Sequence, residues 1–137
     1  MKFRHFICED IRQELNGKVT LTGVYPDDCL LMPEILNQDE NAKEITAIER
    51  LMLLVNISEL DKDTEVFAEI LKPDGTIHGV TQPLGTTKAV KNRSFNVIMN
   101  LSGFPVPIAG IYTIKLRIDE NQYEVPINIQ LENPQIL

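Results

Sequence analysis

The sequence predicts an all-β protein, an antiparallel sandwich of two sheets with about nine strands. Apolar residues recur at every second position along most of the chain, which is the period of a strand with one buried face. Turn sequences such as Asn16-Gly17 and Pro73-Asp74-Gly75 separate these runs. No long segment repeats with the period of an amphipathic helix. A small barrel is the alternative arrangement of the same strands.

The first two strands are expected around residues 3–7 and within KVTLTGVY, residues 18–25. Phe3, His5 and Ile7 alternate in the first, and Val19 and Leu21 alternate in the second. The segment between them is dense in charge and ends in a turn dipeptide. It is therefore predicted to be a connection longer than a tight hairpin, carrying Glu9, Asp10, Arg12 and Glu14.

The next part of the chain contains a short strand, an irregular segment and a buried strand. A strand is expected around Asp28 to Met32. Residues 33–49 are polar, and we expect a long loop or one short helical turn there. From Leu51 to Val55 every residue is apolar, as in a central strand that is covered on both faces.

Five further strands and a hairpin turn are predicted in the middle of the chain and toward its C-terminal end. Pro73-Asp74-Gly75 joins an alternating run to the strand that follows. Another short polar connection spans residues 119–122. Pro126 has no N–H to donate, so its strand should lie at a sheet edge or have a free side there. The predicted inward residues are Val66, Ala68, Ile70, Phe95, Val97, Met99, Leu101, Tyr112, Ile114, Leu116, Ile118, Tyr123, Val125, Ile127, Ile129 and Leu131.

The sequence PIAGIYTIKL favours the sandwich over the barrel. Tyr112 enters a strand two residues after Gly110, which is the local pattern of a tyrosine corner. We therefore expect its hydroxyl to bond to backbone a few residues upstream.

Length and composition indicate one globular domain, residues 1–137. The chain has 137 residues, of which 43% are hydrophobic and 24% charged, as in ordinary folded proteins. Its net charge of −7 and its scattered basic residues argue against binding nucleic acid through phosphates. Imitation of nucleic acid toward a basic partner is the weaker alternative reading of this charge.

The chain is expected to be cytoplasmic, without a membrane segment. Charged residues interrupt the apolar residues of MKFRHFICED, and no run is long enough to span a bilayer. Cys8 and Cys29 are then expected to be buried small hydrophobic side chains rather than a disulfide.

No catalytic or cofactor motif is present, so we expect no enzyme, no cofactor and no metal centre. His5 lies in a strand pattern and is expected to pack. A hydrolase using His78 with a distant carboxylate ranks last among the functional hypotheses. Acidic pairs at several predicted loops, such as Asp27-Asp28, give calcium binding a mechanism, but their spacing matches no calcium loop and a solvated surface is simpler.

The segment SGFPVPIAG, residues 102–110, is the other candidate for function. Its prolines keep it extended, and Phe104, Val106 and Ile108 add apolar side chains. We favour a connection between the sheets whose side chains close one end of the core. A loop that binds a partner through Phe104 and Val106 is the alternative.

Several segments together resemble a family of small bacterial and phage-associated proteins of unknown function. They are EDIRQE, GKVTLTGVY, the PDG hairpin and the late F-P-x-P-x-x-G-x-Y sequence. The resemblance implies an immunoglobulin-like sandwich, and it implies no activity and no site residues.

The leading functional hypothesis is a non-enzymatic module that binds another protein, in a setting that the resemblance makes phage- or prophage-associated. Its docking surface would be the charged segment with Glu9, Asp10, Arg12 and Glu14, because binding residues commonly lie on the connections of a rigid β scaffold. The alternative is a structural subunit, a homo-oligomer formed by pairing of edge strands.

Overall fold

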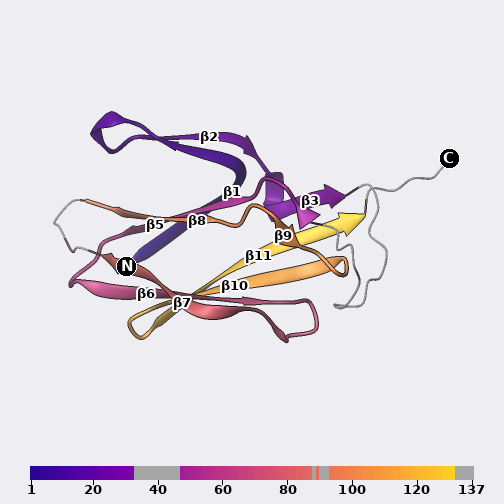
Figure 1. The fold of residues 1–137 in the computed structure, drawn as a ribbon. Helices are drawn as coiled ribbons and strands as arrows, with labels where there is room; N and C mark the ends of the chain where they lie inside the picture. The colour runs from indigo at the N-terminus through magenta and orange to yellow at the C-terminus, as the bar shows by residue number, and fades with distance from the viewer. Residues whose placement is uncertain (33–46, 88, 90–92, 132–137) are drawn as a thin grey trace.

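The computed structural model describes residues 1–32, 47–87, 89 and 93–131, and this part of the chain is built from strands (Figure 1). Two short 3-10 turns interrupt them, η1 at Leu15–Gly17 and η2 at Pro26–Asp28. The described strands are β1 (Lys2–Gln13), β2 (Val19–Val24), β3 (Cys29–Met32), β4 (Ala47–Ile48), β5 (Met52–Ser58), β6 (Thr64–Leu71), β7 (Ile77–Thr87), β8 (Phe95–Asn100), β9 (Phe104–Pro105), β10 (Gly110–Ile118) and β11 (Asn121–Leu131).

The all-β prediction is confirmed, and the two strands beyond the expected set are the short β4 and β9. A four-stranded sheet has the order β2-β1-β5-β8, and a five-stranded sheet has the order β3-β11-β10-β6-β7. Within the described part of the chain, β4 pairs with β9 and with no other strand. Among the described residues none of these sheets closes into a barrel.

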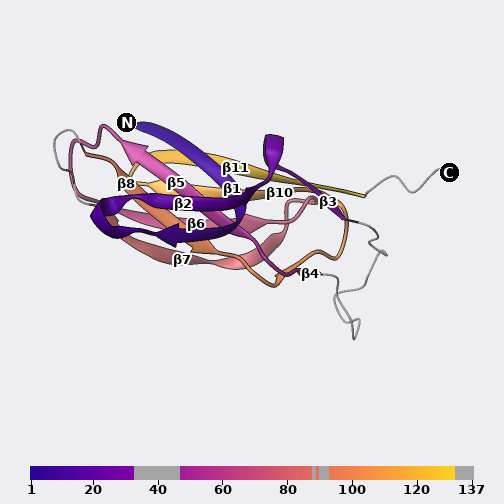
Figure 2. The ribbon, with the colours of Figure 1, turned by 90° about the horizontal axis from the view of Figure 1, so that it is seen from above.

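The two larger sheets lie on either side of a shared core, as the two views of the ribbon show (Figures 1 and 2). The alternating residues of β6, β8, β10 and β11 supply most of its side chains, as the period-two pattern predicts. Leu131 is the exception, because it lies at the end of its strand and is exposed. β5 runs between β1 and β8, and Leu53, Leu54 and Val55 are all buried, so the prediction of a covered central strand is confirmed.

The two predicted turns, at Pro73-Asp74-Gly75 and at residues 119–122, form as expected. β6 returns as β7 around Asp74, whose carboxylate accepts hydrogen bonds from the N–H and hydroxyl of Thr76. β10 returns as β11 directly, since Ile118 is opposite Asn121. These turns therefore follow from local sequence alone.

The pairing of β3 corrects the expectation of a wholly antiparallel fold. β3 pairs with β11 in parallel, with Cys29 opposite Asn128. The chain crosses from β2 in the four-stranded sheet to β3 in the five-stranded sheet through η2. No local sequence pattern predicts this crossing. Because β3 begins opposite Asn128, Pro126 lies beyond its pairing, and the expected free side at the proline is confirmed.

The predicted tyrosine bond is present. The Tyr112 hydroxyl donates a hydrogen bond of 2.8 Å to the Ile108 carbonyl oxygen, and the Tyr112 side chain is fully buried. Burial raises the pKa of this phenol. The bond fixes the chain where it leaves β9 and enters β10.

The irregular segment predicted at residues 33–49 lies largely outside the described residues. Its last part includes β4, where Ile48 is buried opposite Phe104.

Candidate functional site

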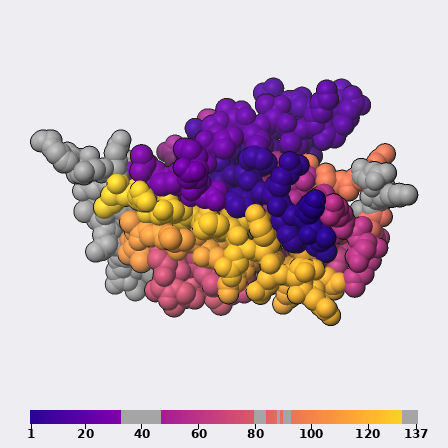
Figure 3. Space-filling view, turned by 180° about the vertical axis from the view of Figure 1, so that it is seen from behind, coloured from indigo at the N-terminus to yellow at the C-terminus, as the bar shows by residue number. Residues whose placement is uncertain are grey.

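Residues 9–24 form a two-stranded hairpin that leaves the four-stranded sheet, and we call it the arm. β1 pairs with β5 from Lys2 to Cys8, and beyond Cys8 its one partner among the described strands is β2. Figures 1 and 2 show the arm turning back over the outer side of this sheet. From behind, its purple atoms rise above the rest of the surface (Figure 3).

The structure corrects the predicted connection between the first two strands. Glu9, Asp10 and Arg12 are residues of β1, and only Glu14 lies in the turn. The strand was missed because polar residues occupy both of its faces, since this half of β1 has no core to bury. All four candidate residues lie on the arm, so the structure brings them onto one element.

The pairing register divides the arm into two faces, because residues opposite each other share a face. Ile11 is opposite Leu21, and Val19 lies on the same side, where all three are half-buried. The other face carries Asp10 opposite Thr22 and Arg12 opposite Thr20, and all of these are exposed. Glu9 belongs to the first face by alternation.

The tip of the arm holds its charge and its most exposed apolar residue together. The Glu14 N–H donates to the Lys18 carbonyl, and the Glu14 carboxylate accepts a bond of 3.2 Å from the Thr20 hydroxyl. Asn16 and Gly17 both have positive φ, as the turn dipeptide predicted. The Leu15 side chain is 87% exposed.

A glycine shapes the base of the arm. Gly23 has φ +66°, and a Cβ there would lie 2.5 Å from an oxygen of Glu9. The Glu9 side chain therefore occupies the space that a Cβ at position 23 would need, and only glycine fits there. Below this point Cys8 is buried, which raises the pKa of its thiol, and it forms no disulfide. Cys29 is also free but is only partly buried.

The other two candidate residues lie elsewhere, in the core. Phe104 is 3% exposed and Val106 is 0% exposed. Neither side chain offers a surface to a partner, and both close the core as the favoured alternative for residues 102–110 predicted. Burial at and just after β9 therefore explains their apolar character.

Sequence reasoning missed a set of three polar side chains that joins the two larger sheets. His5 of β1 lies 2.6 Å from the Tyr123 hydroxyl of β11 through Nδ1 and 2.9 Å from Asp28 of η2 through Nε2. The carboxylate only accepts, so in the neutral ring Nε2 donates to Asp28 and Nδ1 accepts from Tyr123. Burial, and then the Asp28 charge, raise the pKa of Tyr123.

The sequence pattern indicated only part of this group of three side chains. His5 and Tyr123 each occupied an inward position, and polar tips in such positions need hydrogen-bond partners. Nothing in the sequence places residues so far apart next to each other. Phe3 stacks on Tyr123 with 4.9 Å between ring centroids, so the Tyr123 ring also packs at the edge of the core.

His78 is held by packing and by one backbone bond. Its Nε2 lies 2.8 Å from the Pro105 carbonyl, to which it can only donate. Its ring stacks on Phe104 at 4.3 Å between centroids and meets the edge of Tyr112. The ring thus attaches β7 to β9.

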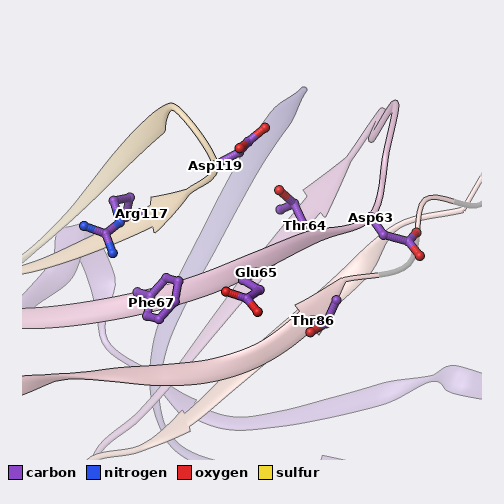
Figure 4. A pocket seen from close by; sticks show the side chains of 7 residues that line it. All are labelled: Asp63, Thr64, Glu65, Phe67, Thr86, Arg117 and Asp119. Atoms are coloured by element: carbon purple, nitrogen blue, oxygen red, sulfur yellow. The ribbon is translucent and has the colours of Figure 1, made fainter.

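A hollow of about 390 Å³ lies on the outer face of the five-stranded sheet (Figure 4). The Arg117 guanidinium lies over the Phe67 ring, 4.9 Å from its centroid. Of the carboxylates in the lining, Asp63 accepts from the Ala89 N–H and Asp119 pairs with Lys62 at 2.7 Å. Internal contacts therefore already engage the Arg117, Asp63 and Asp119 side chains.

The described part of the chain lacks two features. It contains no group of three or more His, Cys, Asp or Glu side chains arranged to hold a metal ion. It also contains no helix with the length and apolar character needed to cross a bilayer.

Comparison of the chain with protein-family models, with curated proteins and with solved structures gave no match.

Proposed function

We propose that this chain is a non-enzymatic protein-interaction module that docks another protein through the arm. One observation carries the proposal. No residue from 9 to 24 is buried, although the segment includes the apolar residues Ile11, Leu15, Val19, Leu21 and Val24. Leu15 and Val24 are exposed and the other three are half-buried, and apolar side chains exposed on an element that leaves the body are typical of an interaction surface.

The tip has the composition of a docking site. Leu15 is an exposed apolar anchor, and Arg12, Glu14 and Lys18 surround it with charge of both signs. An apolar contact at the centre would supply affinity, and charged groups at the rim would orient the partner and speed its association.

The body would serve as the scaffold, and we propose that it is an immunoglobulin-like sandwich. The shared core of the two larger sheets and the bond from Tyr112 to Ile108 support this assignment. Both histidine rings are engaged in internal hydrogen bonds, which favours structural roles for them over catalysis. The two free thiols suit a reducing cytoplasm.

The test is quantitative capture of partners from lysate of the native host, with the tagged wild-type chain and two variants. Leu15→Asp places a charge at the tip of the arm, where no packing is lost. Glu120→Lys is the control, because it changes an exposed residue of another turn, between β10 and β11.

The proposal predicts a protein that wild type and Glu120→Lys retain equally and that Leu15→Asp loses. Reversing the charges of Glu9, Asp10, Arg12 and Glu14 together should also release it. Equal recovery with all of the chains would show that the arm is not the docking element.

A further inference from the structure

Among the described strands, β2 forms an open edge of the four-stranded sheet. It pairs with β1 on one side and is the last strand of the sheet on the other. The Glu14 N–H bonds to the Lys18 carbonyl, so the backbone groups of Lys18 point toward β1. Because direction alternates along an antiparallel ladder, the N–H and C=O groups of Val19 and Leu21 point away from β1, toward the open side.

This edge lacks two of the features by which proteins block strand addition, charged residues and proline. Val19–Val24 contains no charged residue and no proline, and its sequence VTLTGV is rich in β-branched residues. A hairpin of two strands is also marginally stable in water unless further strands or a packed face support it. Both facts indicate that another strand pairs with β2.

We propose that this strand is β2 of a second copy of the chain. The two strands would run antiparallel about a two-fold axis at Thr20, with Val19 of each copy opposite Leu21 of the other. In this register both open-side residues exchange their N–H and C=O groups with the second copy. The strand meets itself, as a two-fold interface requires.

The side chains also match in this register. The half-buried face of the arm continues from Ile11 and Leu21 of one copy to Val19 of the other, which makes one apolar row. At the centre the two Thr20 side chains face each other, a favourable cross-strand pair.

The charges of the arm are complementary across the same axis. Lys18 of one copy lies opposite Thr22 of the other, and Asp10 is the next residue in that row. Neither Lys18 nor Asp10 has an ion-pair partner among the described residues. The second copy therefore places a carboxylate within the row of each lysine.

The first test measures the dimer dissociation constant by sedimentation over a range of concentrations. Val19→Pro removes an N–H that points to the open side, and Lys18 before it already has φ −76° and ψ 151°, which a residue preceding proline adopts. The proposal predicts that this change weakens the dimer by about tenfold or more. Val19→Ala keeps the N–H and is the matched control, with a smaller effect.

A wild-type chain that stays monomeric at all concentrations would overturn the proposal. So would a dimer that Val19→Pro leaves unchanged, since it would use another surface. Thermal unfolding of the Val19→Pro monomer shows whether the body remains folded.

The second test fixes the register by disulfide formation, in a Cys29→Ser background. Across the axis two residues at position 20 form a non-hydrogen-bonded pair with Cα atoms about 4.5 Å apart, within disulfide range. Thr20→Cys should therefore cross-link under mild oxidation. Thr22→Cys, whose two copies would lie about 13 Å apart, should not.

Cross-linking at position 22 alone, or equally at both positions, would contradict the register. These results are separable from the docking proposal, because dimerisation is measured on the purified chain and docking by capture of another protein. A monomeric chain whose Leu15 still retains a partner would overturn only the dimer.

Discussion

Replacing Tyr112 with Phe isolates one hydrogen bond in the described core. The ring is fully buried and remains in the variant, so packing against Phe104 is kept. What is lost is the 2.8 Å bond to Ile108, whose carbonyl then has no hydroxyl donor. Leaving a part-buried acceptor unpaired costs about 1–2 kcal/mol, which corresponds to a fall in Tm of roughly 3–6 °C.

Urea unfolding measures this loss, and Tyr25→Phe is the matched control. The Tyr25 hydroxyl also donates to a backbone carbonyl, that of Arg50 at 3.2 Å, but this bond is exposed and water can replace it. We expect the control to change the free energy of unfolding by less than about 0.5 kcal/mol. The dependence on urea should be the same for all three chains if only stability changes.

Equal stability of Tyr112→Phe and wild type would refute this reasoning. So would an equal loss in both variants, because burial would then not be the cause.

His5→Ala removes the ring that bonds Asp28 and Tyr123, and it should destabilise the fold by about 2 kcal/mol in urea unfolding; a neutral effect would mean that water satisfies both partners. Gly110→Ala should destabilise by about the same amount, because the residue has φ +141° and a Cβ would lie 2.9 Å from the Pro73 side chain. Unchanged unfolding of this variant would show that the Pro73 loop yields. Alkaline pH should also destabilise the protein. Burial raises the pKa of all three tyrosines, Tyr25, Tyr112 and Tyr123, above the ordinary value of 10. The folded chain therefore holds these protons more tightly than the unfolded chain. This contribution is complete below pH 10 and is lost as the pH rises through the higher folded values; a urea midpoint that stays constant above pH 10 would contradict it.

The strands with one buried face could be predicted from sequence because burial imposes an alternation. Tyr112 to Ile118 shows this, since every second residue lies in the core. Two-residue strands such as β4 and β9 carry too little pattern to be seen. The parallel pairing of β3 with β11 depends on a crossing between sheets, and the local sequence around Cys29 does not encode its destination.

The arm was located by its charge but misread as a loop. Asp10 and Arg12 belong to the half of β1 that, among the described strands, pairs with β2 and not with β5, so no core enforces apolar residues on either face. The contact between His5, Asp28 and Tyr123 could not be predicted from the sequence for another reason. The three residues come from three separate elements. Tertiary contact, and not local propensity, creates both features.

The most direct test of the docking role replaces Leu15 with a photo-reactive amino acid in the native host and identifies what cross-links to it. Position 120, in the turn between β10 and β11, is the control site. The account predicts an adduct with another protein at position 15 that is absent at position 120. No adduct at position 15, or an adduct only with a second copy of this chain, would contradict it.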